Sequence, residues 1–208
     1  MISLLGITVF AYLIGSIPSG LIAGKLRGID IRTQGSGSTG STNALRLLGP
    51  RIASIVLAAD VLKGALPVFI ATSGIISSNT FLAQYPAMEA ASGLAVIAGH
   101  NWPIFANFRG GRGVAPALGA ALVMTPLGAV TGLILWGIVV AIWRYVSLAS
   151  LTAVAFTGGL MVINFSTSAV SWPYAVFGSV TIIVVLYQHK GNIKRLMQKK
   201  EPRIGENR

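Results

Sequence analysis

Long apolar stretches alternate along the chain with short segments that are rich in glycine, serine and basic residues. A helix needs about 20 mostly apolar residues to cross the hydrocarbon core of a bilayer. Five stretches approach that length, at residues 2–24, 52–76, 87–106, 148–165 and 172–187. The pattern therefore predicts an all-α integral membrane protein.

The stretch 114–143 is too long for one upright crossing. A helix of that length would extend about 45 Å, whereas the hydrocarbon core is about 30 Å thick. Pro126 and Gly128 lie near its middle, and both residue types break helices. We therefore expect two short crossings here, which brings the predicted total to seven transmembrane helices.

The positions of lysine and arginine distinguish seven spans from six. With seven spans, all 16 basic residues fall on one side of the membrane, and the segments 77–86 and 166–171 on the other side contain none. With six spans, the basic C-terminal tail would lie opposite the first basic loop. Because an excess of Lys and Arg marks the cytoplasmic face, we predict an N-terminus outside and a C-terminus in the cytoplasm.

Composition agrees with a membrane protein. Of 208 residues, 53% are hydrophobic and 10% are charged, against about 25% charged in soluble domains. Residues 1–208 are therefore predicted to form a single polytopic membrane domain. The net charge of +11 lies in short loops, which favours anionic lipid or phosphate substrates over nucleic acid. The chain has no cysteine and its five acidic residues are scattered, so neither a metal nor a cofactor is expected.

Two features inside the spans concern helix packing. Small residues such as Gly15 and Gly119 are frequent there, and they allow helices to approach closely in lipid. Asp60 and Lys63 are three residues apart, so they can face each other on one helix. A structural ion pair and a substrate-facing role are equally consistent with this spacing.

The first polar loop, residues 35–49, combines flexible backbone with hydrogen-bond donors. Glycines let backbone N–H groups turn toward an anion, while Ser36, Asn43 and Arg46 add side-chain donors. A helical turn after Asn43 would bring a positive dipole end close to the serine-rich run. The alternative is a flexible Gly/Ser linker.

The second polar loop leads directly into an apolar stretch. Its centre is Arg109-Gly110-Gly111-Arg112-Gly113, and backbone amides with two guanidiniums at a helix start suit a phosphate. The spacing is not that of a Walker loop. The alternative is simple anchoring at the cytoplasmic face. His100 precedes this loop, has no obvious carboxylate partner in the sequence, and is most consistent with a hydrogen-bonded helix contact.

Two basic segments follow later in the chain. Ser147 lies beside Arg144 and is predicted to cap the next helix. His189 and Asn192 are three residues apart at the end of the last span, so they would share one helix face and could meet one substrate. The alternative for this tail is a polybasic helix that binds anionic lipid.

Four ordered segments resemble the bacterial acyl-phosphate:glycerol-3-phosphate acyltransferase family (the PlsY type). The resemblance begins at Gly15-Ser16-Ile17-Pro18-Ser19-Gly20. The first loop resembles GSGNxGATNxxRxLG, with Ser38 and Ser41 in place of Asn and Ala. The second resembles GHxFPxFxxFKGGKGVAT, with substitutions at Trp102, Arg109, Arg112 and Pro116. The tail resembles HRxNIxRLxxGxE through residues that include His189, Asn192 and Glu201.

The resemblance implies an enzyme of the bacterial cell (inner) membrane that needs no cofactor and acts at the cytoplasmic face. It would transfer a fatty acyl group from acyl phosphate to glycerol 3-phosphate and release lysophosphatidic acid among membrane lipids. The implied roles are glycerol 3-phosphate binding for Arg109, Gly110, Gly111, Arg112 and Gly113, catalysis for Ser36, Arg46, His189 and Asn192, and a structural role for Glu201. We also expect Asn43 to bind substrate.

Two other functions fit parts of the pattern. A transporter of phosphorylated metabolites would explain the spans and the anion loops, but it predicts a midplane site and repeat symmetry, and the sequence shows no repeat. A scaffold that is held at anionic lipid by its tail leaves the ordered first loop unexplained.

Overall fold

The computed structural model describes residues 4–73 and 85–206, and every regular element in these ranges is a helix. Four helical segments are long and apolar enough to cross a membrane: Leu4–Lys25, Pro50–Thr72, Pro126–Trp143 and Val146–Ser166. Val114–Met124 and Trp172–Gln188 are shorter apolar helices. The predicted all-α fold is therefore confirmed for the described ranges, and these helices have the length and composition of membrane spans. Most of the segment 77–86 lies outside them.

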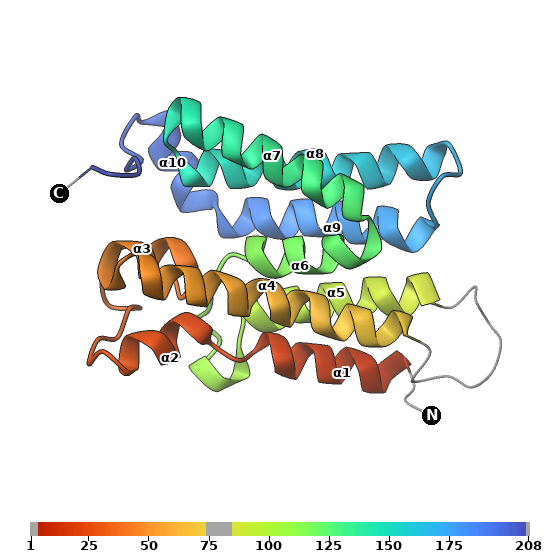
Figure 1. The fold of residues 1–208 in the computed structure, drawn as a ribbon, viewed down its shortest axis with the longest axis horizontal. Coiled ribbons are helices and arrows are strands. Elements are labelled where there is room, and N and C mark those ends of the chain that lie inside the picture. The colour runs from red at the N-terminus through yellow and green to blue at the C-terminus, as the bar shows by residue number, and fades with distance from the viewer. Residues whose placement is uncertain (1–3, 74–84, 207–208) are drawn as a thin grey trace. The chain divides into compact units, whose positions relative to one another are not determined.

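The chain divides into two compact units, residues 1–124 and 125–208. The helices of unit 1 are α1 (Leu4–Gly15), α2 (Ser19–Lys25), α3 (Ser41–Leu48), α4 (Pro50–Thr72), α5 (Tyr85–Asn101), the short 3₁₀ turn η2 (Ile104–Ala106) and α6 (Val114–Met124). Helix α4 contacts every other α-helix of the unit (Figure 1). The segment between α2 and α3 and the segment between α5 and α6 lie at one end of unit 1.

Two predicted spans are interrupted. The stretch 2–24 is not continuous, because α1 ends at Gly15 and α2 begins at Ser19, after Pro18. The stretch 87–106 also ends early, since α5 stops at Asn101 and Pro103 precedes η2. Proline lacks the backbone N–H that a helix interior requires and disfavours helical geometry in the preceding residue. At the first break the Ile17 carbonyl accepts from Lys63 Nζ, and next to the second break the His100 carbonyl accepts from the Gly111 N–H of the polar loop.

Glycines bring the helices of unit 1 together. A Cβ atom built at Gly15 on α1 would overlap the Val96 carbonyl of α5, and one at Gly119 on α6 would overlap the Val61 carbonyl of α4. Only glycine permits such close contact between backbones. The predicted packing role of the small residues is confirmed.

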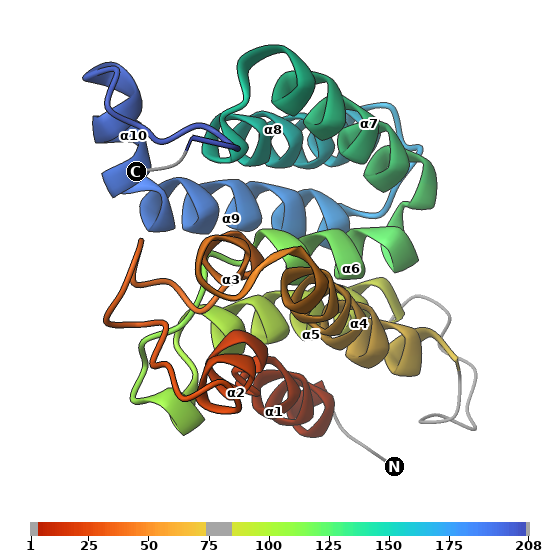
Figure 2. The ribbon, with the colours of Figure 1, turned by 60° about the vertical axis from the view of Figure 1, so that its left-hand side comes forward.

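Unit 2 contains α7 (Pro126–Trp143), α8 (Val146–Ser166), α9 (Trp172–Gln188) and α10 (Lys190–Met197). Helix α8 packs against both α7 and α9 (Figure 2). The predicted division of 114–143 is confirmed, because α6 ends at Met124 and α7 starts with Pro126 at its first position. Proline is well suited to that position, where its missing N–H costs nothing.

Candidate functional site

The side chain of Asn43 organises the first loop from the start of α3. Asn43 is 1% exposed. Its Nδ2 donates to the carbonyls of Ile31 at 2.8 Å and Ser38 at 3.0 Å, and its Oδ1 accepts from the Ser36 backbone N–H at 2.9 Å. The loop is therefore a folded structure built around one amide, and the flexible-linker interpretation is wrong.

The predicted helical turn is present and begins two residues before Asn43. Helix α3 starts at Ser41, so its positive end follows the serine-rich run directly. The side chains of Ser36 and Arg46 are exposed to solvent. In contrast, the Asn43 amide is engaged by the loop's own backbone, which supports a positioning role; substrate binding by Asn43 stays a prediction.

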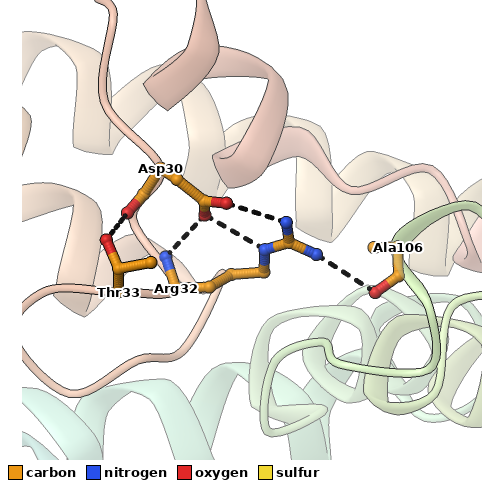
Figure 3. A network of polar contacts seen from close by, with 4 residues as sticks. All are labelled: Asp30, Arg32, Thr33 and Ala106. Atoms are coloured by element: carbon orange, nitrogen blue, oxygen red, sulfur yellow. Dashed lines mark hydrogen bonds and ion pairs between the residues drawn. The ribbon is translucent and has the colours of Figure 1, made fainter.

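A local ion pair in the segment before the first loop is hydrogen-bonded to η2, which precedes the second loop. The Arg32 guanidinium binds Asp30 through two bonds, Nε to Oδ1 at 3.0 Å and Nη2 to Oδ2 at 2.8 Å (Figure 3). Its Nη1 donates to the Ala106 carbonyl in η2 at 3.3 Å. The hydrogen bonds from Arg32 lower the pKa of Asp30 to about 2. The carboxylate therefore stays ionised throughout the physiological range.

The second loop lies against both the first loop and α5. The Thr39 N–H donates to the Gly110 carbonyl at 3.4 Å, and the Gly111 N–H donates to the His100 carbonyl at 3.0 Å. Gly113 has φ of +83°, a conformation that favours glycine, and α6 begins at the next residue. The structure thus brings the two predicted anion loops together within unit 1, with the amino end of α6 beside Arg112.

Asp60 and Lys63 form the ion pair that their spacing predicted. Lys63 Nζ lies 2.8 Å from Asp60 Oδ1, and both side chains are buried. Ser19 Oγ donates to the same carboxylate oxygen at 2.7 Å. His100 also has a carboxylate neighbour, contrary to expectation, because its Nδ1 lies 3.6 Å from Asp60 Oδ1. The partner is 40 positions away in the sequence, so no local pattern could reveal it.

In unit 2, Glu201 connects the tail to α8 and α10. Its Oε1 accepts from Ser147 Oγ at 2.8 Å and from Asn192 Nδ2 at 2.6 Å, and its Oε2 accepts from Arg195 Nε at 2.7 Å. Burial raises the pKa of Glu201, but these three donors outweigh it and the net pKa is lowered. The predicted capping role of Ser147 is wrong, since Tyr145 occupies the cap position and Ser147 binds Glu201 instead.

His189 and Asn192 are both buried, at the junction of α9 and α10. His189 Nδ1 lies 2.8 Å from the Val185 carbonyl, one turn earlier in α9. Asn192 donates from its Nδ2 to Glu201. Its side-chain carbonyl oxygen is a hydrogen-bond acceptor. Their catalytic roles stay predictions.

Chemically, the two loops of unit 1 suit a phosphorylated substrate. The positive charge comes from exposed Arg109 and Arg46. Further hydrogen-bond donors come from backbone N–H groups at the start of α6 and from the hydroxyl of Ser36. Among the described residues, no group of three or more His, Asp or Glu side chains could hold a metal ion. Arg32 and Ser19 belong to this framework, and sequence reasoning missed both. The Asp30-x-Arg32 spacing, which permits a local ion pair, was the available signal for Arg32.

Comparisons with known proteins agree with this chemistry. Residues 5–199 match the family model described as glycerol-3-phosphate acyltransferase. A glycerol-3-phosphate acyltransferase of Prochlorococcus marinus (strain NATL1A) is 40% identical over 198 residues, which are 95% of this chain and 96% of that protein. One from Gloeobacter violaceus is 41% identical over 203 residues, 97% of this chain and 95% of that protein.

Two solved structures are also similar. The crystal structure of PlsY, an integral membrane glycerol 3-phosphate acyltransferase, in its glycerol 3-phosphate form has a TM-score of 0.86 and 35% identity, covering 97% of this chain and 96% of that one. Its lysophosphatidic acid form has a TM-score of 0.82, covering 97% and 95%.

Proposed function

Because the chain belongs to the glycerol-3-phosphate acyltransferase family, we propose that it transfers a fatty acyl group from acyl phosphate to the sn-1 hydroxyl of glycerol 3-phosphate. The product is lysophosphatidic acid, the first intermediate of phospholipid synthesis. The observation that carries this proposal is the contact between the two Gly-rich basic loops, through the Thr39–Gly110 hydrogen bond. This bond supports the proposal because it brings the backbones of the two loops together within unit 1.

The second loop is proposed to bind glycerol 3-phosphate. The backbone of Gly110 and Gly113 offers N–H donors just before α6, and Arg109 and Arg112 supply the matching positive charge. Gly111 lies between them and contributes to the shape of the loop, because its own N–H donates to the His100 carbonyl. Guanidinium groups bind phosphate oxygens in pairs. This loop therefore fixes the phosphate end of the acceptor.

The first loop is proposed to act at the reacting atoms. Exposed Ser36 precedes the amino end of α3, where a positive dipole stabilises anionic oxygens, and exposed Arg46 supplies a guanidinium from the last turn of the same helix. Asn43 holds the loop backbone that carries Ser36. We assign Ser36 and Arg46 to orienting the acyl phosphate and stabilising charge at the acyl carbonyl.

In unit 2, His189 and Asn192 are assigned a contribution to the reaction because they match the family's tail segment, HRxNIxRLxxGxE. Glu201 is assigned a structural role, which its three hydrogen bonds support.

The reaction needs little covalent help from the protein. Acyl phosphate is a mixed anhydride with a good leaving group, so alignment and charge stabilisation suffice. The glycerol hydroxyl oxygen attacks the acyl carbon, and the bond from that carbon to the phosphate oxygen breaks. The electron pair leaves with inorganic phosphate, and a phosphate oxygen takes the hydroxyl proton. No acyl-enzyme forms, so a covalent acyl-protein trapped with acyl phosphate alone would contradict this route.

The proposed topology has seven spans in the bacterial inner membrane, with an outside N-terminus and a cytoplasmic C-terminus. The one-sided distribution of lysine and arginine supports it. The spans would be the α1–α2 pair, α4, α5, α6, α7, α8 and α9. All of residues 1–208 would then form one membrane domain.

A reconstitution assay tests the function. Purified protein in lipid vesicles is given acyl phosphate and labelled glycerol 3-phosphate, and labelled lysophosphatidic acid is measured. We expect product only when both substrates are present. Uptake of labelled glycerol 3-phosphate without any product would instead favour a transporter.

A further inference from the structure

One buried carboxylate is connected to both polar loops, and the proposed reaction does not use it. Asp60 on α4 is 1% exposed. Its Oδ1 accepts from Ser19 Oγ at 2.7 Å and lies 2.8 Å from Lys63 Nζ and 3.6 Å from His100 Nδ1. Lys63 balances the negative charge, so the carboxylate does not repel a phosphate bound to the loops nearby.

On one side, this network supports the second loop through His100. The His100 carbonyl accepts from the Gly111 N–H at 3.0 Å. A Cβ atom built at Gly110 would overlap that carbonyl, and one at Gly111 would overlap the imidazole at Nε2. The histidine therefore forms the surface on which the Gly110–Gly111 backbone rests, and Asp60 faces the opposite edge of the ring.

On the other side, the network supports the first loop through α2. Gly20 follows Ser19, and a Cβ atom there would overlap the Thr39 carbonyl. Thr39 in turn donates its N–H to Gly110 at 3.4 Å. Lys63 Nζ also donates to the Ile17 carbonyl at 2.9 Å, which lies in the break between α1 and α2. The interrupted first span is thereby tied to both loops.

We propose that Ser19, Asp60 and His100 form a positioning network that holds the two loops in the geometry required for glycerol 3-phosphate binding. His100 is the positioning residue for Gly110 and Gly111, and Asp60 couples it to α2. The inference rests on the proposed function. Backbone donors act on a phosphate only when correctly placed, and an error of about 1 Å can cost about 100-fold in rate.

A double-mutant cycle between His100 and Gly111 tests the contact itself. His100→Asn keeps an amide donor toward Asp60 and removes the ring edge that meets Gly111. We expect it to raise the KM for glycerol 3-phosphate at least tenfold, with kcat within about threefold and the KM for acyl phosphate within about twofold. Gly111→Ala should raise the KM for glycerol 3-phosphate at least tenfold in the wild-type background. The increase should be much smaller in the His100→Asn background, because the added Cβ atom no longer overlaps the imidazole.

Ser19→Ala and Thr72→Val form a matched pair that leaves His100 intact. Each removes one hydroxyl bonded to a buried carboxylate, Asp60 in the first case and Glu89 in the second. Thr72 lies 12 residues beyond Asp60 on α4, about 18 Å away along the helix. We expect Ser19→Ala to raise the KM for glycerol 3-phosphate about threefold and Thr72→Val to leave it unchanged.

The outcomes separate the two proposals. A wild-type protein that makes no lysophosphatidic acid contradicts the proposed function. The positioning network is overturned if the wild type is active but the effects of His100→Asn and Gly111→Ala on the KM for glycerol 3-phosphate simply add. It is also overturned if His100→Asn raises the KM for acyl phosphate as much as the KM for glycerol 3-phosphate. If His100→Asn fails to fold, Ser19→Ala decides by the same KM criterion, and an unchanged KM overturns the proposal.

Discussion

Arg112 is the side chain whose loss is expected to affect glycerol 3-phosphate binding most selectively. Hydrogen bonds to charged groups contribute about 1.5–3 kcal/mol, so Arg112→Ala should raise the KM for glycerol 3-phosphate by roughly 10- to 100-fold. Arg112→Lys keeps the charge but loses the guanidinium fork, and a smaller increase is expected. Steady-state kinetics with each substrate varied in turn provide the measurement. An unchanged KM for Arg112→Ala would remove the second loop from phosphate binding.

Arg32 is expected to act indirectly, because its guanidinium binds Asp30 in the segment before the first loop and donates to the Ala106 carbonyl before the second loop. We expect Arg32→Ala to raise the KM for glycerol 3-phosphate up to about fivefold, since a partly exposed ion pair contributes little on its own. Arg27→Ala, at an exposed basic residue just before the same loop, should have no such effect and serves as the control. Equal effects of the two variants would point to net charge and not to the bond to Ala106.

The pH dependence of the Arg32 link follows from the lowered pKa of Asp30. Because the folded-state pKa is about 2, the link is fully present above the ordinary aspartate pKa of about 3.9. It is lost only as the pH falls through about 2. The contribution of Arg32 to KM should therefore be constant across the range in which the enzyme is assayed.

At the scale of helices, α8 offers an internal comparison of two adjacent glycines. A Cβ atom at Gly158 would lie 2.8 Å from the Gly178 carbonyl of α9, whereas one at Gly159 would meet nothing within 4 Å. Gly158→Ala should destabilise unit 2 by about 1–3 kcal/mol through overpacking. Gly159→Ala should be neutral or stabilising by up to about 1 kcal/mol, from helix propensity. Thermal unfolding in detergent distinguishes them, and equal shifts would contradict the close α8–α9 contact.

The connection between the tail and α8 depends on an ionised Glu201. Its lowered pKa means that its stabilisation is fully present above the ordinary glutamate pKa of about 4.3 and is lost as the pH falls through the lower folded-state value. Glu201→Gln should lower the free energy of unfolding by about 2–3 kcal/mol at pH 7, since three hydrogen-bond donors lose a charged acceptor.

The measurement for Glu201 is the difference in thermal stability between wild type and Glu201→Gln as a function of pH. We expect this difference to shrink as the pH falls below about 4.3. Glu206→Gln, at an exposed carboxylate, is the control and should differ little from wild type at any pH. A difference that stays constant with pH would show that ionisation of Glu201 is irrelevant to the connection.

Features with local causes were predictable from the sequence, and features made by distant contacts were not. The break before Pro126 follows from proline's missing N–H, and the Asp60–Lys63 pair follows from helical spacing. In contrast, His100 meets Asp60 only because α4 and α5 pack together. The sequence identified Asn43 as a hydrogen-bonding residue, but its acceptors became visible only in the folded loop.

At the scale of the whole molecule, the interrupted spans explain how a small membrane protein can gather two polar loops at one end of unit 1. The break after Asn101 lies where the chain leaves α5 for the second polar loop, and the break after Gly15 separates α1 from the short α2 that leads toward the first loop. Irregular backbone at such depths is tolerated only where its polar groups find partners. Lys63 provides one by binding the Ile17 carbonyl. The breaks and the ion pair therefore form one arrangement that supports the loops.

Membrane topology gives the test at this scale, and the chain suits it because it contains no native cysteine. Single cysteines replace Gln34, Ser168 and Lys194, which are all exposed, and a membrane-impermeant thiol reagent is applied to intact cells and to inverted vesicles. With seven spans, positions 34 and 194 react only in inverted vesicles and position 168 reacts in intact cells. With six spans, positions 168 and 194 exchange sides, because the number of crossings between them and the first loop changes by one. Labelling of position 194 from outside would therefore place the tail across the membrane from the first loop, and His189 and Asn192 could not then act in a cytoplasmic reaction.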